Sequence, residues 1–163
     1  GARRSRVVAS GGQPGDEPSP PRQRAGEASR RSVVRALDDH GYCIVSGFLP
    51  PAKLAALRAD MLAAAGKSPT GRNKFEGSKT RRVYAVFAKT REFDDIVTDP
   101  LVLGVLEDVL GTAHFNLSSP TGIQIGPGER EQILHRDDGK YPIPRPHQEV
   151  VVNTMFALDD FTE

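Results

Sequence analysis

The stretch Gln132-Ile133-Leu134-His135-Arg136-Asp137-Asp138 carries the strongest signal for fold and chemistry in this sequence. It holds a histidine and an aspartate two residues apart. Side chains on an extended strand alternate between its two faces, so His135 and Asp137 are expected to project to the same side. Ile133 continues that face as an apolar wall, and Arg136 points the other way. One side of this predicted strand could therefore hold a metal ion.

The donor types of this pair are those of a non-heme iron site. A neutral imidazole and an ionised carboxylate are two members of the 2-His-1-carboxylate triad, which binds Fe(II) and leaves three positions open. The letters His-Arg-Asp also occur in the catalytic loop of protein kinases, which needs an Asn five residues after the Asp. Here that position is Pro142, and there is no glycine-rich loop followed by a strand lysine. The kinase alternative therefore fails.

Three further segments accompany this motif along the chain. They are Gly41-Tyr42-Cys43-Ile44-Val45, Ile123-Gln124-Ile125-Gly126-Pro127-Gly128-Glu129 and Phe156-Ala157-Leu158-Asp159-Asp160-Phe161. Together with Leu134-His135-Arg136-Asp137-Asp138, they make the sequence resemble the phytanoyl-CoA dioxygenase-like family of Fe(II)- and 2-oxoglutarate-dependent oxygenases. The resemblance covers residues 32 to 163, and the order and separation of the segments are more specific than any one of them.

The resemblance implies an α+β fold whose core is a double-stranded β-helix, a jelly-roll or cupin-like arrangement, with flanking N-terminal helices. The C-terminal part offers strands at 113–118, 122–125, 132–137 and 149–158, which is half of the family's eight-stranded core. We therefore expect a chain that is truncated at its C-terminus. The predicted domains are a disordered basic tail at 1–31 and the N-terminal part of the oxygenase domain at 32–163.

The resemblance also implies the activity. It predicts a non-heme iron dioxygenase that uses O2 to hydroxylate a small organic substrate while 2-oxoglutarate is decarboxylated to succinate. His135 and Asp137 would be the metal ligands for Fe(II). The third ligand, a histidine, and the arginine that binds 2-oxoglutarate are expected beyond Glu163. His147 follows the pair by only ten residues within a proline-rich loop, so we do not expect it to be the third ligand.

Polar residues around the motif are candidates for ligand binding. Asn153 and Gln124 stand in apolar strands, where a buried amide needs partners, and they are predicted to bind the cosubstrate. Arg82 is a weaker candidate for the same role. Lys140 and Tyr141 lie in the proline-rich loop after the motif and are predicted to contact a substrate, which their charge and aromatic face suggest is anionic. For Asn153 and Gln124, the alternative is that each amide pairs with neighbouring backbone or faces solvent. For the loop that carries Lys140 and Tyr141, the alternative is a solvated connection.

Composition limits the other classes of function. The chain has 163 residues and a net charge of +1, so whole-chain electrostatics makes no case for a nucleic-acid partner. Residues 1–31 hold seven arginines and three acidic residues among many Gly, Pro and Ser, which predicts a disordered linker. A targeting peptide or an anionic-surface contact is the alternative for this tail. No apolar run is long enough to cross a bilayer, which predicts no membrane partner.

Cysteine content and local patterning complete the expectations. Cys43 is the single cysteine, so neither an intrachain disulfide nor a cysteine-based zinc site can form, and a cytoplasmic location is the simplest. Helix and strand signals alternate through the first two thirds of the chain. They predict a helix at 32–40, capped by Ser32 and ended by Gly41, and a strand at 42–48. A helix at 51–66, a loop at 67–80 and a strand at 81–87 follow. The last predicted helix starts at Asp99-Pro100 and is ended by Gly111.

Two other classes stay open. One is a catalytically inactive jelly-roll protein or fragment that binds a ligand or a partner and lacks the third metal ligand. The other is a cupin-like enzyme that uses a different metal or no 2-oxoglutarate. Conversion of 2-oxoglutarate to succinate that depends on Fe(II) separates the leading prediction from both. For residues 1–163 alone, we expect weak metal affinity, no turnover and self-association through unpaired strand edges.

Overall fold

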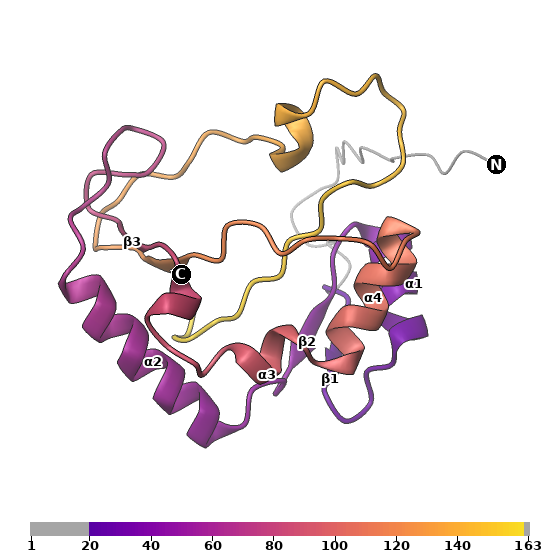
Figure 1. Ribbon diagram of the computed structural model, residues 1–163, viewed down its shortest axis with the longest axis horizontal. Helices are drawn as coiled ribbons and strands as arrows, with labels where there is room; N and C mark the ends of the chain where they lie inside the picture. The colour runs from indigo at the N-terminus through magenta and orange to yellow at the C-terminus, as the bar shows by residue number, and fades with distance from the viewer. Residues whose placement is uncertain (1–19, 162–163) are drawn as a thin grey trace, which may run out of the picture.

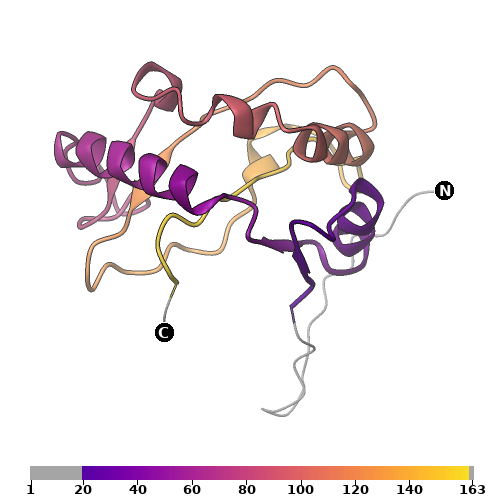
Figure 2. The ribbon, with the colours of Figure 1, turned by 90° about the horizontal axis from the view of Figure 1, so that it is seen from below.

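The computed structural model describes residues 20–161, in which short strands alternate with helices. The elements are β1 (Arg22–Arg24), α1 (Arg30–His40), β2 (Ile44–Ser46), α2 (Pro51–Gly66), β3 (Arg81–Val83), η1 (Val86–Ala88), α3 (Asp94–Val97), α4 (Pro100–Leu110), β4 (Gly122–Gln124) and η2 (Asp137–Lys140). Helices α1 and α4 lie side by side at one end of the molecule and α2 lies at the other (Figures 1 and 2). The C-terminal segment crosses the space between them.

The N-cap of helix α1 lies three residues earlier than the sequence analysis predicted. Ser29 is its N-cap: the Ser29 hydroxyl accepts from the Ser32 backbone N–H at 3.2 Å, and the Ser32 hydroxyl accepts from the Ser29 N–H at 3.0 Å. The prediction of Ser32 as the cap was wrong because the two serines form a reciprocal capping box, in which Ser32 is the third helical residue. Gly41, with φ of 82°, ends the helix as predicted.

Helices α2 and α4 confirm the local signals that predicted them. Pro51 lies in the first turn of α2, and Leu57 and Met61 are buried one turn apart on its inner face. At the start of α4, one carboxylate oxygen of Asp99 accepts from two backbone N–H groups, those of Leu101 at 2.8 Å and Val102 at 3.2 Å. Helix α4 therefore begins at its predicted Asp99 cap and stops before Gly111, and α2 begins at the predicted Pro51 and extends through Gly66.

The first predicted strands are present but shorter than expected. The strand predicted at 42–48 forms only β2, and the strand predicted at 81–87 ends after Val83. The chain then turns at Ala85, whose φ is 52°, into the short helix η1. A strand continues only where a neighbouring strand pairs with its backbone. The partner of β3 is β4, and the two pair over three residues, with Arg82 opposite Ile123.

The C-terminal half differs most from the prediction. Of the four strands expected there, only the one at 122–125 forms, as β4, which is antiparallel to β3. The segments 113–118, 132–137 and 149–158 form no strands. Between residues 20 and 161 the sheets are two pairs, β1 with β2 and β3 with β4, and they do not close into a barrel. The double-stranded β-helix is therefore not formed by the described residues.

The end of the predicted disordered tail is ordered. Within it, β1 pairs in parallel with β2, with Arg22 opposite Ile44, and α1 begins at Arg30. Part of the segment predicted as disordered thus forms secondary structure, and the amide of half-buried Gln23 in β1 lies 3.6 Å from the Cys43 sulfur. Residues 1–19, the rest of that predicted tail, lie outside the described residues.

The hydrophobic core lies between α2 and the sheet of β3 and β4. Met61 and Ala65 of α2 pack on Val83 and Val86. The C-terminal segment returns to this region, where Leu158 packs against the core. The Phe156 ring lies near those of Phe48 and Phe93, at 5.9 and 6.3 Å between centroids. The segment that contains the predicted site is therefore bracketed by anchored residues on both sides.

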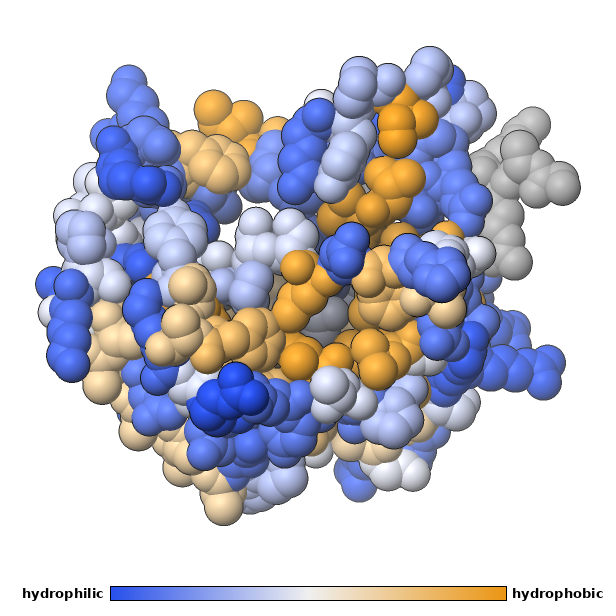
Figure 3. Space-filling model, in the orientation of Figure 1, coloured by the Kyte–Doolittle hydropathy of each residue, from blue (hydrophilic) through white to orange (hydrophobic). Residues whose placement is uncertain are grey.

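Apolar side chains are also exposed on this molecule. Hydrophobic residues gather over the middle of the face shown in Figure 3. Among the large exposed hydrophobic residues, Ile133, Leu134, Met155 and Phe161 each have four fifths or more of their surface accessible. None of the described helices is long and apolar enough to cross a membrane.

Candidate metal centre

His135 and Asp137 lie close together, on the same side of an extended segment. The backbone of Arg136 between them is extended, with φ of −121° and ψ of 130°, so the side chains on either side of it point the same way. His135 Nε2 lies 3.5 Å from Asp137 Oδ1. The juxtaposition predicted from the spacing is therefore present, although the segment has no strand partner among residues 20–161.

The second ring nitrogen of His135 determines which nitrogen can bind a metal. Nδ1 lies 2.8 Å from the backbone oxygen of Ile133. A carbonyl oxygen only accepts hydrogen bonds, so Nδ1 must donate, and in the neutral ring the lone pair is then on Nε2. Nε2 is the nitrogen that faces Asp137. Two acceptors therefore face each other, an arrangement that needs a cation or a proton between them.

Asp137 divides its two oxygens between different partners. Oδ1 faces His135, and Oδ2 accepts a hydrogen bond from the Asn153 side-chain amide. This contact fixes the rotation of the carboxylate, since Asn153 comes from the anchored C-terminal segment. Asn153, predicted from the sequence as a cosubstrate residue, thus lies beside the pair of His135 and Asp137, which we call the metal pair, through its contact with Asp137.

Phe75 and Gln132 are neighbours of the pair that the sequence analysis missed. The Phe75 ring packs edge-on against the His135 imidazole, with 4.8 Å between centroids and 73° between planes. Gln132 Nε2 donates to the Phe75 backbone oxygen at 2.6 Å. The available signal was a single aromatic residue in the polar loop predicted at 67–80, where an exposed ring has no local hydrophobic partner.

The next carboxylate, Asp138, anchors the proline-rich loop. It accepts from the Arg145 guanidinium, and His147 Nε2 lies 3.6 Å from its Oδ2. His147 Nδ1 lies 2.6 Å from the backbone oxygen of Gln148. His147 is therefore engaged next to the motif rather than with His135 and Asp137. In the same loop, Lys140 Nζ lies 5.3 Å from the centroid of the exposed Tyr141 ring, so the two predicted substrate residues are adjacent.

The two remaining candidates lie on opposite faces of the β3–β4 sheet. Gln124 pairs with Arg81, on the face where a side chain at Gly122 would contact Met61 of α2. Arg82 lies on the other face. Its Nε is buried and has no hydrogen-bond partner among the described residues. A buried, unpartnered guanidinium nitrogen is costly unless an acceptor binds there, so Arg82 suits an anionic ligand.

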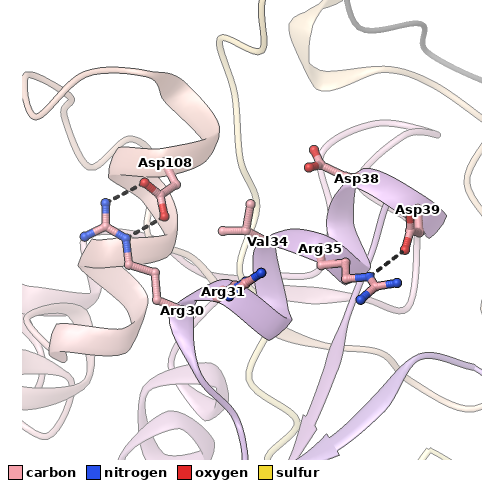
Figure 4. A pocket seen from close by; sticks show the side chains of 7 residues that line it. All are labelled: Arg30, Arg31, Val34, Arg35, Asp38, Asp39 and Asp108. Atoms are coloured by element: carbon pink, nitrogen blue, oxygen red, sulfur yellow. Dashed lines mark hydrogen bonds and ion pairs between the residues drawn. The ribbon is translucent and has the colours of Figure 1, made fainter.

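A second hollow lies between α1 and α4, away from these residues. Figure 4 shows its lining residues, Arg30, Arg31, Val34, Arg35, Asp38, Asp39 and Asp108. Arg30 donates through two nitrogens to the carboxylate of Asp108, each at 2.6 Å, and Arg35 pairs with Asp39. The hydrogen bond to Asp108 is the main cause that raises the pKa of Arg30. The Arg30–Asp108 pair joins α1 to α4, whereas the Arg35–Asp39 pair lies within α1. The hollow includes none of the predicted site residues.

The pair fits a metal ion as two of its ligands. Two donors that are each about 2.1 Å from one ion and 90° apart lie about 3 Å from each other. The distance of 3.5 Å between Nε2 and Oδ1 is close to that value. Residues 20–161 contain no group of three or more His, Cys, Asp or Glu side chains that could hold a metal. The described residues therefore provide a two-donor motif on an extended segment.

Comparison with known proteins identifies the family that carries this motif. The family model described as phytanoyl-CoA dioxygenase matches residues 37–163. The chain belongs to this family, as its resemblance to the family predicted.

Curated relatives agree with this assignment. Dioxygenase aneA of Aspergillus aculeatus is 30% identical over 156 residues, which is 87% of this chain and 52% of that protein. Dioxygenase FUM3 of Gibberella moniliformis is 28% identical over 150 residues, with 80% and 50% covered, and dioxygenase olcK of Penicillium canescens is 25% identical over 145 residues, with 80% and 48% covered. The chain spans about half the length of the curated relatives that it matches.

Proposed function

We propose that the whole protein is a dioxygenase dependent on Fe(II) and 2-oxoglutarate, which hydroxylates a small organic substrate and converts 2-oxoglutarate to succinate. The observation that carries the proposal is the approach of His135 Nε2 to Asp137 Oδ1 at 3.5 Å, while Nδ1 faces the Ile133 oxygen. A divalent cation relieves the repulsion between these two acceptors. Membership of the family and the names of the dioxygenase relatives support the choice of chemistry.

Two of the three iron ligands would then be His135 and Asp137. The third ligand would come from outside residues 20–161, in a part of the whole protein that closes the jelly-roll, double-stranded β-helix core. The coverage of only about half of each relative supports this expectation. Bound Fe(II) would supply the coordination positions at which 2-oxoglutarate and O2 react.

The other residues would bind and orient the organic molecules. Arg82 offers its guanidinium, whose Nε has no partner among the described residues, to a carboxylate of 2-oxoglutarate, and Asn153 holds the Asp137 carboxylate in place. Gln124 stays a predicted cosubstrate residue, on the opposite face of its sheet from Arg82. Lys140 and Tyr141 provide a positive charge and an aromatic face to an anionic substrate. The charge of Arg145 is already matched by Asp138.

The test is 2-oxoglutarate turnover by the whole protein. We expect succinate to form only when Fe(II) and O2 are present, and His135→Ala and Asp137→Ala to abolish its formation. His114→Ala is the matched control, because His114 is exposed and its only hydrogen bond among the described residues is from its backbone to Thr112.

A whole protein that binds no Fe(II) and forms no succinate would contradict the proposal. That result would favour the alternative of a jelly-roll protein that binds a ligand or a partner without catalysis. Turnover of a substrate with another metal, or without 2-oxoglutarate, would favour the other alternative, a cupin-like enzyme of different chemistry.

A further inference from the structure

The loop between α2 and β3 is closed at its base. Thr70 forms a bridge with Arg81, and the Gly71 N–H donates to the Thr80 oxygen at 2.8 Å. Gly71 is required at this closure, because a Cβ there would lie 1.9 Å from the backbone oxygen of Gly77. The loop is therefore held shut by backbone contacts that a side chain would disrupt.

Side chains inside the loop hold the position of Phe75. The Asn73 side-chain oxygen accepts from the backbone N–H groups of Phe75 at 3.0 Å and Glu76 at 2.9 Å. The Glu76 carboxylate in turn accepts from the backbone and the guanidinium of Arg72, at 2.9 and 2.6 Å, and from the Tyr84 hydroxyl at 3.3 Å. Phe75 thus projects from the loop between Asn73 and Glu76, two residues whose side chains are both hydrogen-bonded.

Phe75 contacts the segment of the metal pair at two residues, His135 and Gln132. Its ring lies edge-on to the His135 imidazole, and its backbone oxygen accepts from Gln132, three residues before His135. The segment at 131–136 has no strand ladder among the described residues to fix it. The contacts with Phe75 therefore join this segment to a distant, closed loop of the chain.

We propose that Phe75 is a positioning residue of the metal centre. Its ring restricts rotation of the His135 imidazole, so that Nε2 stays directed at Asp137 Oδ1 while Nδ1 keeps its contact with the Ile133 oxygen. A ligand that is already oriented loses less freedom when it binds a metal. This inference rests on the proposed function, because it takes His135 to be a metal ligand.

The test compares metal binding by variants of the whole protein. Co(II) is the probe, and the readouts are its dissociation constant and its visible absorption, which reports the coordination geometry. We expect Phe75→Ala to weaken Co(II) binding about threefold to tenfold, the range that corresponds to an aromatic pair contact, and to change the absorption. Phe75→Tyr retains the ring edge and should restore both, whereas Phe75→Leu retains only apolar bulk and should not.

Matched controls separate positioning from a general loss of stability. Tyr42→Ala removes an aromatic side chain that is 49% exposed, close to the 50% of Phe75, from a position two residues before β2. It should leave Co(II) binding unchanged. If Phe75→Ala binds Co(II) with the affinity and absorption of the unmodified protein, the inference is wrong. The proposed function itself fails if the unmodified protein binds no Co(II), or if His135→Ala binds Co(II) as tightly as the unmodified protein. These outcomes differ from an effect-free Phe75→Ala, so the two failures are distinguishable.

Discussion

Adjacent carboxylates in the motif have different partners, and this separates their roles. Asp137 faces His135 and Asn153, whereas Asp138 is occupied by Arg145 and His147. A carboxylate already paired with a guanidinium is a poor metal ligand, because its charge is compensated. Of the two, Asp137 is therefore the better candidate for a metal ligand, which is the role predicted for it from the alternation of side chains. Asp138 instead fixes where the following loop leaves the motif.

Because of Glu76, the free energy of unfolding should depend on pH in the acidic range. Hydrogen bonds from Arg72 lower the pKa of Glu76 from its ordinary 4.5 to about 2. Because the pKa is lower in the folded state, the ion pair stabilises the fold fully above about pH 4.5, and this contribution is lost as the pH falls towards 2. We expect Glu76→Gln to lower the free energy of unfolding at neutral pH.

The measurement is urea unfolding from pH 6 to pH 2. The difference in unfolding free energy between the unmodified protein and Glu76→Gln should shrink below about pH 4.5 and vanish near pH 2. Glu131→Gln, at an exposed position, is the control and should show no such pH dependence. A difference that stays constant over the whole range would show that the Arg72–Glu76 pair does not stabilise the fold.

At the scale of elements, the loop at 70–80 depends on one glycine. Replacing Gly71 by Ala places a methyl group against the Gly77 oxygen, so we expect a loss of about 1–3 kcal/mol in the free energy of unfolding, as for other overpacked sites. Gly66→Ala is the control, since a Cβ at the end of α2 meets nothing within 4 Å. Urea unfolding of both variants checks the prediction, which an unchanged stability of Gly71→Ala would refute.

Helices and strands of this chain differ in how far the sequence predicts them. The cap at Asp99 and the stop at Gly111 are local signals, and α4 ends where they place it. The extent of a strand depends instead on a partner far along the chain. The run from Arg81 looks like seven residues of strand, but only three pair with β4, and the turn at Ala85 is a tertiary effect without a local signal.

For the molecule as a whole, the sequence predicted the closeness of His135 and Asp137 better than the contacts that surround them. The alternation of side chains depends only on an extended backbone, so the closeness of His135 and Asp137 follows from their spacing. The contacts of His135 with Phe75 and of Asp137 with Asn153 join residues 60 and 16 positions apart. Such contacts depend on how distant segments pack, and no periodicity or motif in either segment encodes them.

The exposed apolar surface leads to a prediction about residues 1–163 produced alone. Leu134 is fully exposed and Ile133 is 85% exposed, in a segment whose backbone has no strand partner among the described residues. Surfaces and edges of this kind tend to associate. We expect the apparent mass of residues 1–163 to rise with concentration in light scattering, and Leu134→Lys to reduce that rise. Tyr42→Lys, at a half-exposed position near β2, should leave it unchanged. If residues 1–163 remain monomeric at all concentrations, the prediction is wrong, because the exposed apolar surface would then not cause association.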